Sequence, residues 1–581
     1  MIKRKRLFQS EENIKSAARV AMSVYSKDKI YNSNNLENFC EVFDLLRMNS
    51  VPLKYVFQIE DESFRSSLNQ GMIDDINLEI EKYNLWNNEF ETFGRILSQN
   101  NIRYIFIKTP GFFPYTCGNL DMLVEKINTN KTKSLLEAFG FIELKNIPEP
   151  HKWLYKTFDT GKEILAIHLH ETVYWGGTFL DSKQIWSNFR NKKNSDNPTA
   201  LAPEDLVLTT MAHSLYENAT IRLLDFSIIK YLIENNSMNW LYIKNIAYIY
   251  KWIDGLYISM ILYNHINKKI FGNDLIPKHI IEESNNYINK NILLKLIISD
   301  LLKSKLGMPF YIPIVLCKYL HYKKIIQYSE HGGTLKGFLA ATEALIDGIH
   351  AYLGITKQKP MLIALSGLDG SGKSSYGSAI ERSFEACGFK TEYIWARPGS
   401  THIFRKMKDI FSKTKVISEF SEDAESPCNN FFRTNQIFRN KWIMLFWQIT
   451  SLIDFCIYYN LKIWSAVLSK KIVICDRYIL DASVDLYTYS NDKHISPINI
   501  KLFLKLLPKA DKVIFLDVSP EVALERSKGK ECFEYLCRQK ELYDQILPNF
   551  NVDSYKAEKS LHYSCNKLIN NILIGFYKKY S

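Results

Sequence analysis

The sequence has little that points to a metal-stabilised or secreted protein. Its 581 residues contain ten scattered cysteines without CxxC pairs or metal-ligand spacing, which predicts reduced thiols in a reducing, cytoplasmic compartment. The basic start, Met1–Arg6, is followed by Gln9, Glu11 and Glu12 instead of an apolar run, so we expect no secretory signal. Repeats and low-complexity linkers are also missing. The net charge of +12 is spread thinly, without a compact basic cluster interleaved with aromatics, and we expect no nucleic-acid partner.

One apolar stretch, Trp442–Trp464, is long enough to raise the question of a membrane span. Polar residues interrupt it at Gln448, Asp454, Asn460 and Lys462. We therefore expect a buried helix in the core of a soluble domain and no membrane span.

The residue pattern changes twice along the chain and predicts three domains. Residues 1–98 read as helical. Residues 99–355 combine a few strands with a helical extension that begins at Pro203, where acidic residues fill the first turn. The strands expected in this region are Ile102–Ile107, Leu120–Val124 and Glu163–His170. We therefore expect a mixed α+β domain in residues 99–355 and a separate α/β domain in residues 356–581.

Short apolar strands alternate with helical patterns in residues 356–581. The expected strands are Met361–Leu365, Thr391–Trp395, Ile472–Cys475 and Val513–Asp517. A helix is expected from Lys373 to the helix-ending Gly388. Such alternation predicts a three-layer α/β fold, with a parallel sheet between two layers of helices.

The segment Gly367–Ser374 fits the phosphate-binding pattern GxxxxGK[ST], and it stands between an expected strand and an expected helix. Glycines let the backbone turn its N–H groups toward phosphate oxygens, and the helix adds its positive N-terminal end. Lys373 would reach the β- and γ-phosphates of ATP, and Ser374 would bind Mg²⁺. The residues predicted to bind ATP are Gly367, Gly370, Ser371, Gly372, Lys373, Ser374 and Ser375.

Further charged residues follow at the carboxyl ends of expected strands, where ligands bind in such sheets. Asp476 is expected to share in holding Mg²⁺, and Arg477 to clamp the transferred phosphoryl group; an isolated surface ion pair is the alternative. Arg397, at the end of the second strand, either binds phosphate or belongs to a plain turn. A basic stretch either closes over phosphates as a lid or is a solvated loop; it contains Arg526, Lys528 and Lys530.

Together these residues resemble the thymidylate kinase family over about residues 359–574. The likeness rests on the phosphate-binding loop, on Arg397-Pro398-Gly399, on Asp476-Arg477-Tyr478 and on Phe515–Arg526. It implies that Asp369, Arg397 and Arg477 address the phosphate acceptor. It also implies a catalytic set of Lys373, Asp476, Arg477 and Asp369.

The resemblance fails at the position where that family recognises the base of its substrate. An arginine is usual about 21 residues before the aspartate of the Asp-Arg-Tyr segment, and this position holds Phe455 (476 − 21 = 455), with Ile457 two residues on. A phenyl ring can stack on a base but cannot donate hydrogen bonds to it. The sequence therefore does not support thymidylate as the specific acceptor, and Phe455 is the candidate for stacking on a base.

The middle region resembles a family of nucleotidyltransferase-like proteins over about residues 100–240. The likeness rests on the turn at Lys108, on Asn119 and Asp121 in place of an Asp-x-Asp pair, and on the later strand with His168 and His170. That chemistry needs two or three carboxylates around magnesium, and only Asp121 remains, so we expect a retained fold without ordinary transferase activity. We further expect the two histidines to face opposite sides of their strand and not to share a metal site.

We thus predict an ATP- and Mg²⁺-dependent kinase acting on a small, nucleoside monophosphate-like acceptor, and we leave a homodimer open. The alternative is a nucleotide-binding regulatory or scaffold module that carries a degenerate nucleotidyltransferase domain. A third candidate, an active nucleotidyltransferase, would depend on Asp121.

Overall fold

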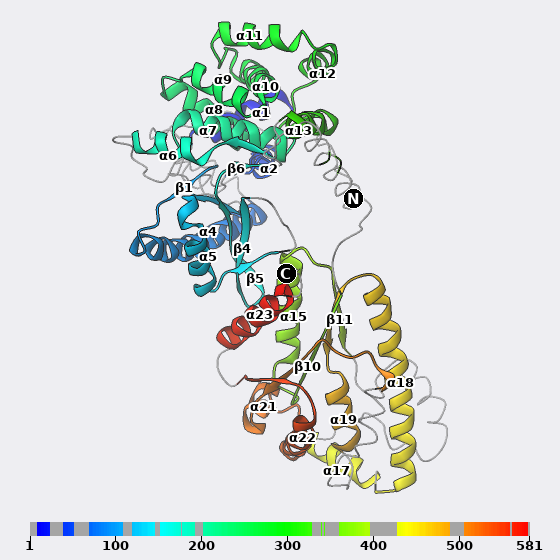
Figure 1. Cartoon of the computed structure of the whole chain (residues 1–581). Helices are drawn as coiled ribbons and strands as arrows, with labels where there is room; N and C mark the ends of the chain where they lie inside the picture. Colours follow the sequence, from blue (N-terminus) through cyan, green and yellow to red (C-terminus); the bar gives the residue numbers. More distant parts are fainter. Residues whose placement is uncertain are drawn as a thin grey trace. The chain divides into compact units, whose positions relative to one another are not determined.

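A computed structural model gives the structure of the chain (Figure 1). It describes residues 9–23, 39–51, 69–108, 119–145, 151–175, 177–191, 201–327, 339, 342, 360–395, 427–437, 439–488, 505–557 and 561–578. Two compact units are present, the first built mainly from residues up to 354 and the second mainly from residues 355 onward. Each unit is described by itself.

A mixed five-stranded sheet organises the first unit, in the order β1-β2-β5-β4-β3. Its strands are β1 Tyr104–Phe106, β2 Leu120–Val124, β3 Ile142–Glu143, β4 Lys152–Asp159 and β5 Lys162–His170. Strand β2 is antiparallel to β1 but parallel to β5, with Asp121 opposite His168. The expected strands are therefore present, while β3 and β4 were missed. Two small hairpin pairs also occur: β6 Val173–Tyr174 with β7 Thr178–Leu180, and β8 Thr220–Ile221 with β9 Phe310–Tyr311.

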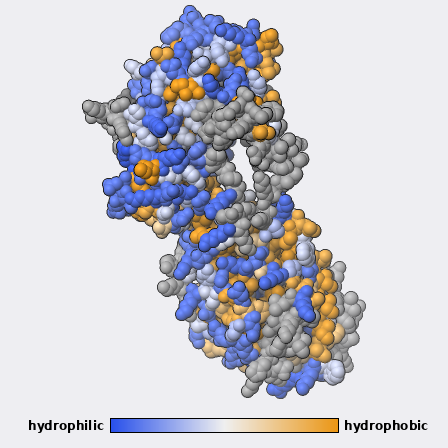
Figure 2. All heavy atoms as spheres, viewed as in Figure 1, coloured by the Kyte–Doolittle hydropathy of each residue, from blue (hydrophilic) through white to orange (hydrophobic). Residues whose placement is uncertain are grey.

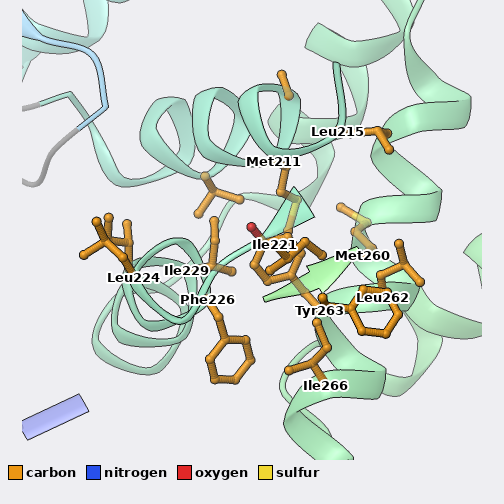
Figure 3. Close-up of a cluster of buried hydrophobic side chains, with 14 of the residues drawn as sticks. Met211, Leu215, Ile221, Leu224, Phe226, Ile229, Met260, Leu262, Tyr263 and Ile266 are labelled. Atoms are coloured by element: carbon orange, nitrogen blue, oxygen red, sulfur yellow. The ribbon is translucent and has the colours of Figure 1, made fainter. Parts of the chain in front are cut away.

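Helices make up the rest of the first unit and form its largest core (Figure 3). Side chains such as Met211, Phe226 and Met260 come from different helices and are buried together. The core also takes in Ile14 and Val42, so the N-terminal helices pack with the later ones in one cluster. The described helices of the first unit are α1 Glu11–Ser23, α2 Phe39–Met48, α4 Gln70–Gln99, α5 Thr129–Ala138, α6 Ser182–Asn191, α7 Pro203–Ala212, α8 Leu223–Asn235, α9 Trp240–Ile249, α10 Ile253–Phe271, α11 Lys278–Ile288, α12 Ile292–Lys303 and α13 Ile314–Gln327. A π-helical turn, His213–Glu217, follows α7.

The second unit is a three-layer α/β fold around a fully parallel sheet, as predicted. The strand order is β11-β12-β10-β13-β14. Its strands are β10 Met361–Gly367, β11 Thr391–Trp395, β12 Ile472–Asp476, β13 Lys512–Asp517 and β14 Asp553–Lys556. Helix α15, Lys373–Ala386, packs on three of these strands and against α23, Leu561–Lys578. These two helices cover one side of the sheet, and α18, Lys441–Leu468, packs on the other (Figure 1). The remaining helices are α17 Pro427–Ile437, α19 Ile479–Thr488, α21 Pro520–Ser527 and α22 Phe533–Ile546.

Helix α18 corresponds to the apolar stretch, and it is buried on one side only. Phe455 and Tyr459 face the core, whereas an apolar stripe faces outward (Figure 2). The exposed stripe consists of Trp442, Leu445, Phe446, Ile449, Ile453, Ile457, Leu461, Trp464 and Leu468. By length and composition α18 is the one described helix that could cross a membrane, and 33% of its most apolar window is buried. The expectation of a buried core helix therefore holds for the inner face of α18 but not for its outer face.

One cysteine pair departs from the expectation that all the cysteines are reduced thiols. Cys428 of α17 and Cys532, which caps α22, form a disulfide across 104 positions of sequence. Sequence spacing could not reveal this pair, because it depends on the approach of two helices that are far apart in the chain.

Candidate active site

The predicted phosphate-binding loop, Gly367–Ser374, connects the end of β10 to the start of α15, and its shape requires glycine. Gly370 has φ +85°, and a Cβ atom at this position would lie 2.2 Å from the carbonyl oxygen of Ala523. Gly372, the residue before α15, has φ +94°. Side chains are disfavoured in this left-handed region, so the loop conformation depends on these two residues.

Lys373 holds its ammonium group inside the curve of this loop. The Nζ atom donates hydrogen bonds to the carbonyl oxygens of Gly367, at 2.7 Å, and Leu368, at 2.8 Å. It also lies 3.8 Å from Asp369 Oδ1. The lysine side chain is 5% exposed. A nearly buried cation is therefore held among the loop residues that were predicted to bind phosphate.

Ser374 and Asp476 come together although 102 positions separate them in sequence. Ser374 Oγ donates to Asp476 Oδ2 over 2.6 Å. The phenol of Tyr393, on β11, donates to the same oxygen over 2.7 Å. The other oxygen, Asp476 Oδ1, is buried and has no hydrogen-bond partner among the described residues. A hydroxyl and a buried carboxylate with a free oxygen are suitable ligands for Mg²⁺.

Arg477 adopts an unusual backbone conformation beside this carboxylate. Its φ is +80°, which is rare for a residue other than glycine and is often associated with functional sites. Its amide donates to the carbonyl oxygen of Leu365 over 3.0 Å, and the phenol of Tyr459 donates to its carbonyl oxygen over 2.5 Å. These two bonds fix the strained residue against the sheet and α18.

The guanidinium of Arg477 lies in a buried acidic pocket. Its Nη2 atom forms an ion pair with Asp369 Oδ1, and Tyr535 donates to Asp369 Oδ2 over 3.2 Å. Burial alone would lower the pKa of Arg477, but Asp485 and Asp481 more than offset this effect and raise it. Its Nε and Nη1 atoms are buried without hydrogen-bond partners among the described residues. Two donors of a permanent cation are therefore available to an anionic ligand.

Several residues of this pocket were not anticipated from the sequence. Tyr535, Gln539 and Tyr543 lie four residues apart on α22 and therefore share one face of the helix. Gln539 Nε2 donates to the Tyr535 hydroxyl over 2.8 Å, and Tyr543 donates to Asp481 over 2.8 Å. This repeated polar spacing was the available signal, but only the fold shows that the face meets the phosphate-binding loop.

Of the predicted lid residues, Arg526 lies in the last turn of α21, whereas Lys528 caps this helix and Lys530 follows in the turn before α22. Lys528 and Lys530 are exposed. Arg526 is exposed as well, and its Nη2 atom donates to the carbonyl oxygen of Ala557 over 2.8 Å. Ser375 is exposed in the first turn of α15. Arg397 lies outside the described residues, so the structure gives no position for it.

Phe455 is fully buried against Tyr459, with 4.4 Å between the ring centroids. As placed, neither face of its ring is exposed, so stacking on a base would require this region to open. Ile457, by contrast, belongs to the exposed face of α18.

The first unit contains a second polar cluster, at the ends of β2 and β5. His168 Nδ1 lies 3.1 Å and His170 Nε2 lies 3.0 Å from the same oxygen, Asp121 Oδ1. The expectation that the two histidines face opposite sides was wrong, because residues two positions apart lie on the same face of a strand. Burial alone would raise the pKa of Asp121, but Lys108 and both histidines hold it well below its ordinary value.

Lys108 links this cluster to the π-helical turn. Its Nζ atom lies 3.2 Å from Asp121 Oδ2 and 3.3 Å from Glu217 Oε2. Glu217 also pairs with His213 at 3.0 Å and with Lys152 at 3.7 Å. Asn119, the other predicted position, is half-buried directly before β2. One side of the first unit therefore carries a buried network of alternating charges.

Two segments of the chain match known protein families. Residues 115–267 match the family described as "Uncharacterised nucleotidyltransferase", and residues 454–556 match "Thymidylate kinase". A "Probable thymidylate kinase" of Archaeoglobus fulgidus is 26% identical over 222 residues, covering 37% of this chain and 96% of that protein. A "Thymidylate kinase" of Leptospira interrogans serovar copenhageni is 24% identical over 219 residues, covering 36% of this chain and 93% of that protein. The chain thus combines a nucleotidyltransferase-like region with a thymidylate kinase-like region.

Proposed function

We propose that the second unit transfers the terminal phosphoryl group of ATP to a small acceptor of the nucleoside monophosphate class. The main support for this proposal is the hydrogen bond from Ser374 to Asp476 beside the predicted phosphate-binding loop. A phosphoryl-transfer site needs little covalent chemistry from the protein, because positioning and charge neutralisation supply most of the catalysis. The distant thymidylate kinase relatives support nucleotide kinase chemistry of this kind.

The loop and the start of α15 would together bind ATP. The backbone N–H groups of the loop and the start of α15 would bind the phosphates, and Lys373 would leave its carbonyl partners to neutralise them. Ser374 and Asp476 would hold Mg²⁺, since Asp476 Oδ1 is buried without a hydrogen-bond partner among the described residues. Bound there, the ion would neutralise charge that develops on the phosphate oxygens.

The acceptor would bind on the side of Asp369 and Arg477. Nε and Nη1 of Arg477 can donate to a phosphate, while Asp369 holds the guanidinium in place. Arg397 is proposed to contribute a further cation from the segment after β11. Thymidylate is a poor candidate for the acceptor because Phe455 and Ile457 supply no hydrogen-bond donor to a base.

Helix α18 supports the further proposal of a homodimer. Its exposed apolar stripe would be unfavourable in water, and a second copy of the same helix is a complementary cover. Sedimentation of the full chain tests this point, because Ile453→Asp should favour the monomer if the stripe is an interface.

A panel of acceptors tests the proposed activity. ADP release from ATP and Mg²⁺ should be stimulated by one or more of the thymidine, uridine, cytidine, adenosine and guanosine monophosphates. ATP binding without stimulation by any of them would instead favour the nucleotide-binding regulatory or scaffold module. Exchange of a nucleotide onto an acceptor that Asp121→Asn abolishes would favour an active nucleotidyltransferase.

A further inference from the structure

The cluster at Asp121 brings together one carboxylate and two imidazoles, all able to bind a metal, from two neighbouring parallel strands. Asp121 stands on β2, and both histidines stand on β5, in a register that places Asp121 opposite His168. One nitrogen of each imidazole approaches Asp121 Oδ1 to within 3.1 Å or less. The three ligand atoms all lie within 4.8 Å of one another. This convergence needs no distant loop, because it follows from strand pairing and from the two-residue repeat of β5.

The two oxygens of Asp121 have different surroundings. Lys108 Nζ lies 3.2 Å from Oδ2 and is itself held by Glu217, whereas both imidazoles approach Oδ1. The lysine therefore fixes the orientation of the carboxylate and leaves Oδ1 directed at the two histidines. Protein metal sites commonly orient a ligating carboxylate in this way, through a partner on its other oxygen.

We propose that Asp121, His168 and His170 bind one divalent first-row transition-metal ion, with Zn²⁺ as the favoured ion. Two imidazoles and one carboxylate suit zinc, whereas magnesium prefers ligands that are all oxygen. Bonds of about 2.0–2.2 Å at tetrahedral angles put ligand atoms roughly 3.3–3.5 Å apart, so small movements of the rings would complete the site. The substitution of carboxylates by histidine and asparagine thus changes the preferred metal instead of simply removing a site.

The coordination shell of such a site would be incomplete. Three protein ligands leave a fourth position for water or for an anionic oxygen, as in zinc sites that act on ligands and unlike closed structural sites. The His168 side chain is 10% exposed and is the least buried of the three proposed ligands. Lys152 lies near the same network through Glu217 and adds positive charge for an anion.

Zinc titration of the full chain tests the proposal. The protein is prepared without a histidine tag, stripped with a chelator and titrated with Zn²⁺ in competition with a chromogenic chelator. We expect one zinc per chain, retained in millimolar Mg²⁺, and affinity at least about 100-fold lower in His168→Ala. His279→Ala is the matched control, because His279 is an exposed histidine of the same unit and its loss should change nothing.

Two further variants test whether zinc binds at this cluster and whether its ligands set the metal preference. Asp476→Asn should bind zinc as the parent does, which distinguishes this site from the proposed magnesium site of the kinase. His168→Asp preserves a ligand at this position but adds a carboxylate, so it should shift preference from Zn²⁺ toward Mn²⁺ or Mg²⁺. Circular dichroism of each variant checks that it is folded.

The proposal is overturned if the parent binds no stoichiometric zinc, which would leave a metal-free cluster neutralised by Lys108. It is equally overturned if folded His168→Ala and His168→Asp both bind zinc as the parent does, or if Mg²⁺ competes with Zn²⁺ on equal terms.

Discussion

The phenol of Tyr393 donates a hydrogen bond to Asp476 Oδ2 over 2.7 Å, which joins the edge strand β11 to the centre of the proposed magnesium site. The same oxygen accepts from Ser374, so Oδ2 accepts two hydrogen bonds, while Oδ1 has no partner within the described parts of the chain. Tyr393 therefore orients the carboxylate without needing to touch a substrate.

Tyr393→Phe tests this positioning role. Loss of one hydrogen bond to a charged group costs about 1.5–3 kcal/mol, so we expect the concentration of Mg²⁺ needed for half-maximal ATP turnover to rise roughly 10-fold or more. The magnesium dependence of ADP release measures this effect. Tyr555→Phe, on β14 of the same sheet, removes a phenol that bonds to Asn571 and should leave the magnesium dependence unchanged. Equal behaviour of the two variants would contradict the role.

The loop should tolerate no side chain at Gly370. Gly370→Ala places a Cβ 2.2 Å from the carbonyl oxygen of Ala523 at φ +85°, whereas Gly388→Ala has the same φ with no atom within 4 Å. The control should lose only about 1–2 kcal/mol from the left-handed backbone, and Gly370→Ala a further 1–3 kcal/mol or so from the clash. Denaturant unfolding of both variants measures the difference. Equal losses would mean that α21 moves away freely from the loop.

Asp205, at the start of α7, should make stability depend on pH. Burial raises the pKa of Asp205 to about 6, although Tyr242 and Asn188 hydrogen bonds oppose the rise. A raised acid pKa means that the fold prefers the protonated form. Its stabilising contribution is therefore complete below the unfolded pKa near 4 and is lost as pH rises through about 6.

The Asp205→Asn variant isolates that contribution. The free energy of unfolding of the parent, minus that of the variant, should fall by about 2–3 kcal/mol between pH 4 and pH 7. Denaturant unfolding at several pH values gives this difference. Parallel curves for the two proteins would show that Asp205 ionises normally in the folded state.

The acidic pocket around Arg477 should affect the KM of the proposed acceptor. Tyr535 donates to Asp369, which pairs with Arg477. We expect Tyr535→Phe to raise the KM of the acceptor by about 3–10-fold, through the loss of one hydrogen bond, with a smaller effect on the KM of ATP. An equal rise in both KM values, measured in the same assay, would argue against a separate acceptor side.

The parallel sheet and the strand–turn–helix shape of the glycine-rich loop were predictable because their signals are local. A strand, a glycine-rich turn and a helix are adjacent in sequence around Lys373, and parallel strands bring Asp476 to the same edge. Tyr393, Tyr535 and the Cys428–Cys532 pair were missed, since their contacts depend on how distant elements approach. The error on His168 and His170 was one of strand periodicity, which the residues themselves could have corrected. The outer face of α18 was misjudged because apolar composition does not tell core from exposed surface.

Direct detection of phosphoryl transfer tests the central claim. The full chain is incubated with Mg²⁺, ATP labelled in its terminal phosphate, and each monophosphate, and the products are separated by chromatography. The account predicts labelled diphosphate from at least one acceptor, a rate reduced at least about 100-fold by Lys373→Ala, and an unchanged rate in the control Lys556→Ala. Label that never leaves ATP for any acceptor, or full transfer by Lys373→Ala, would contradict it.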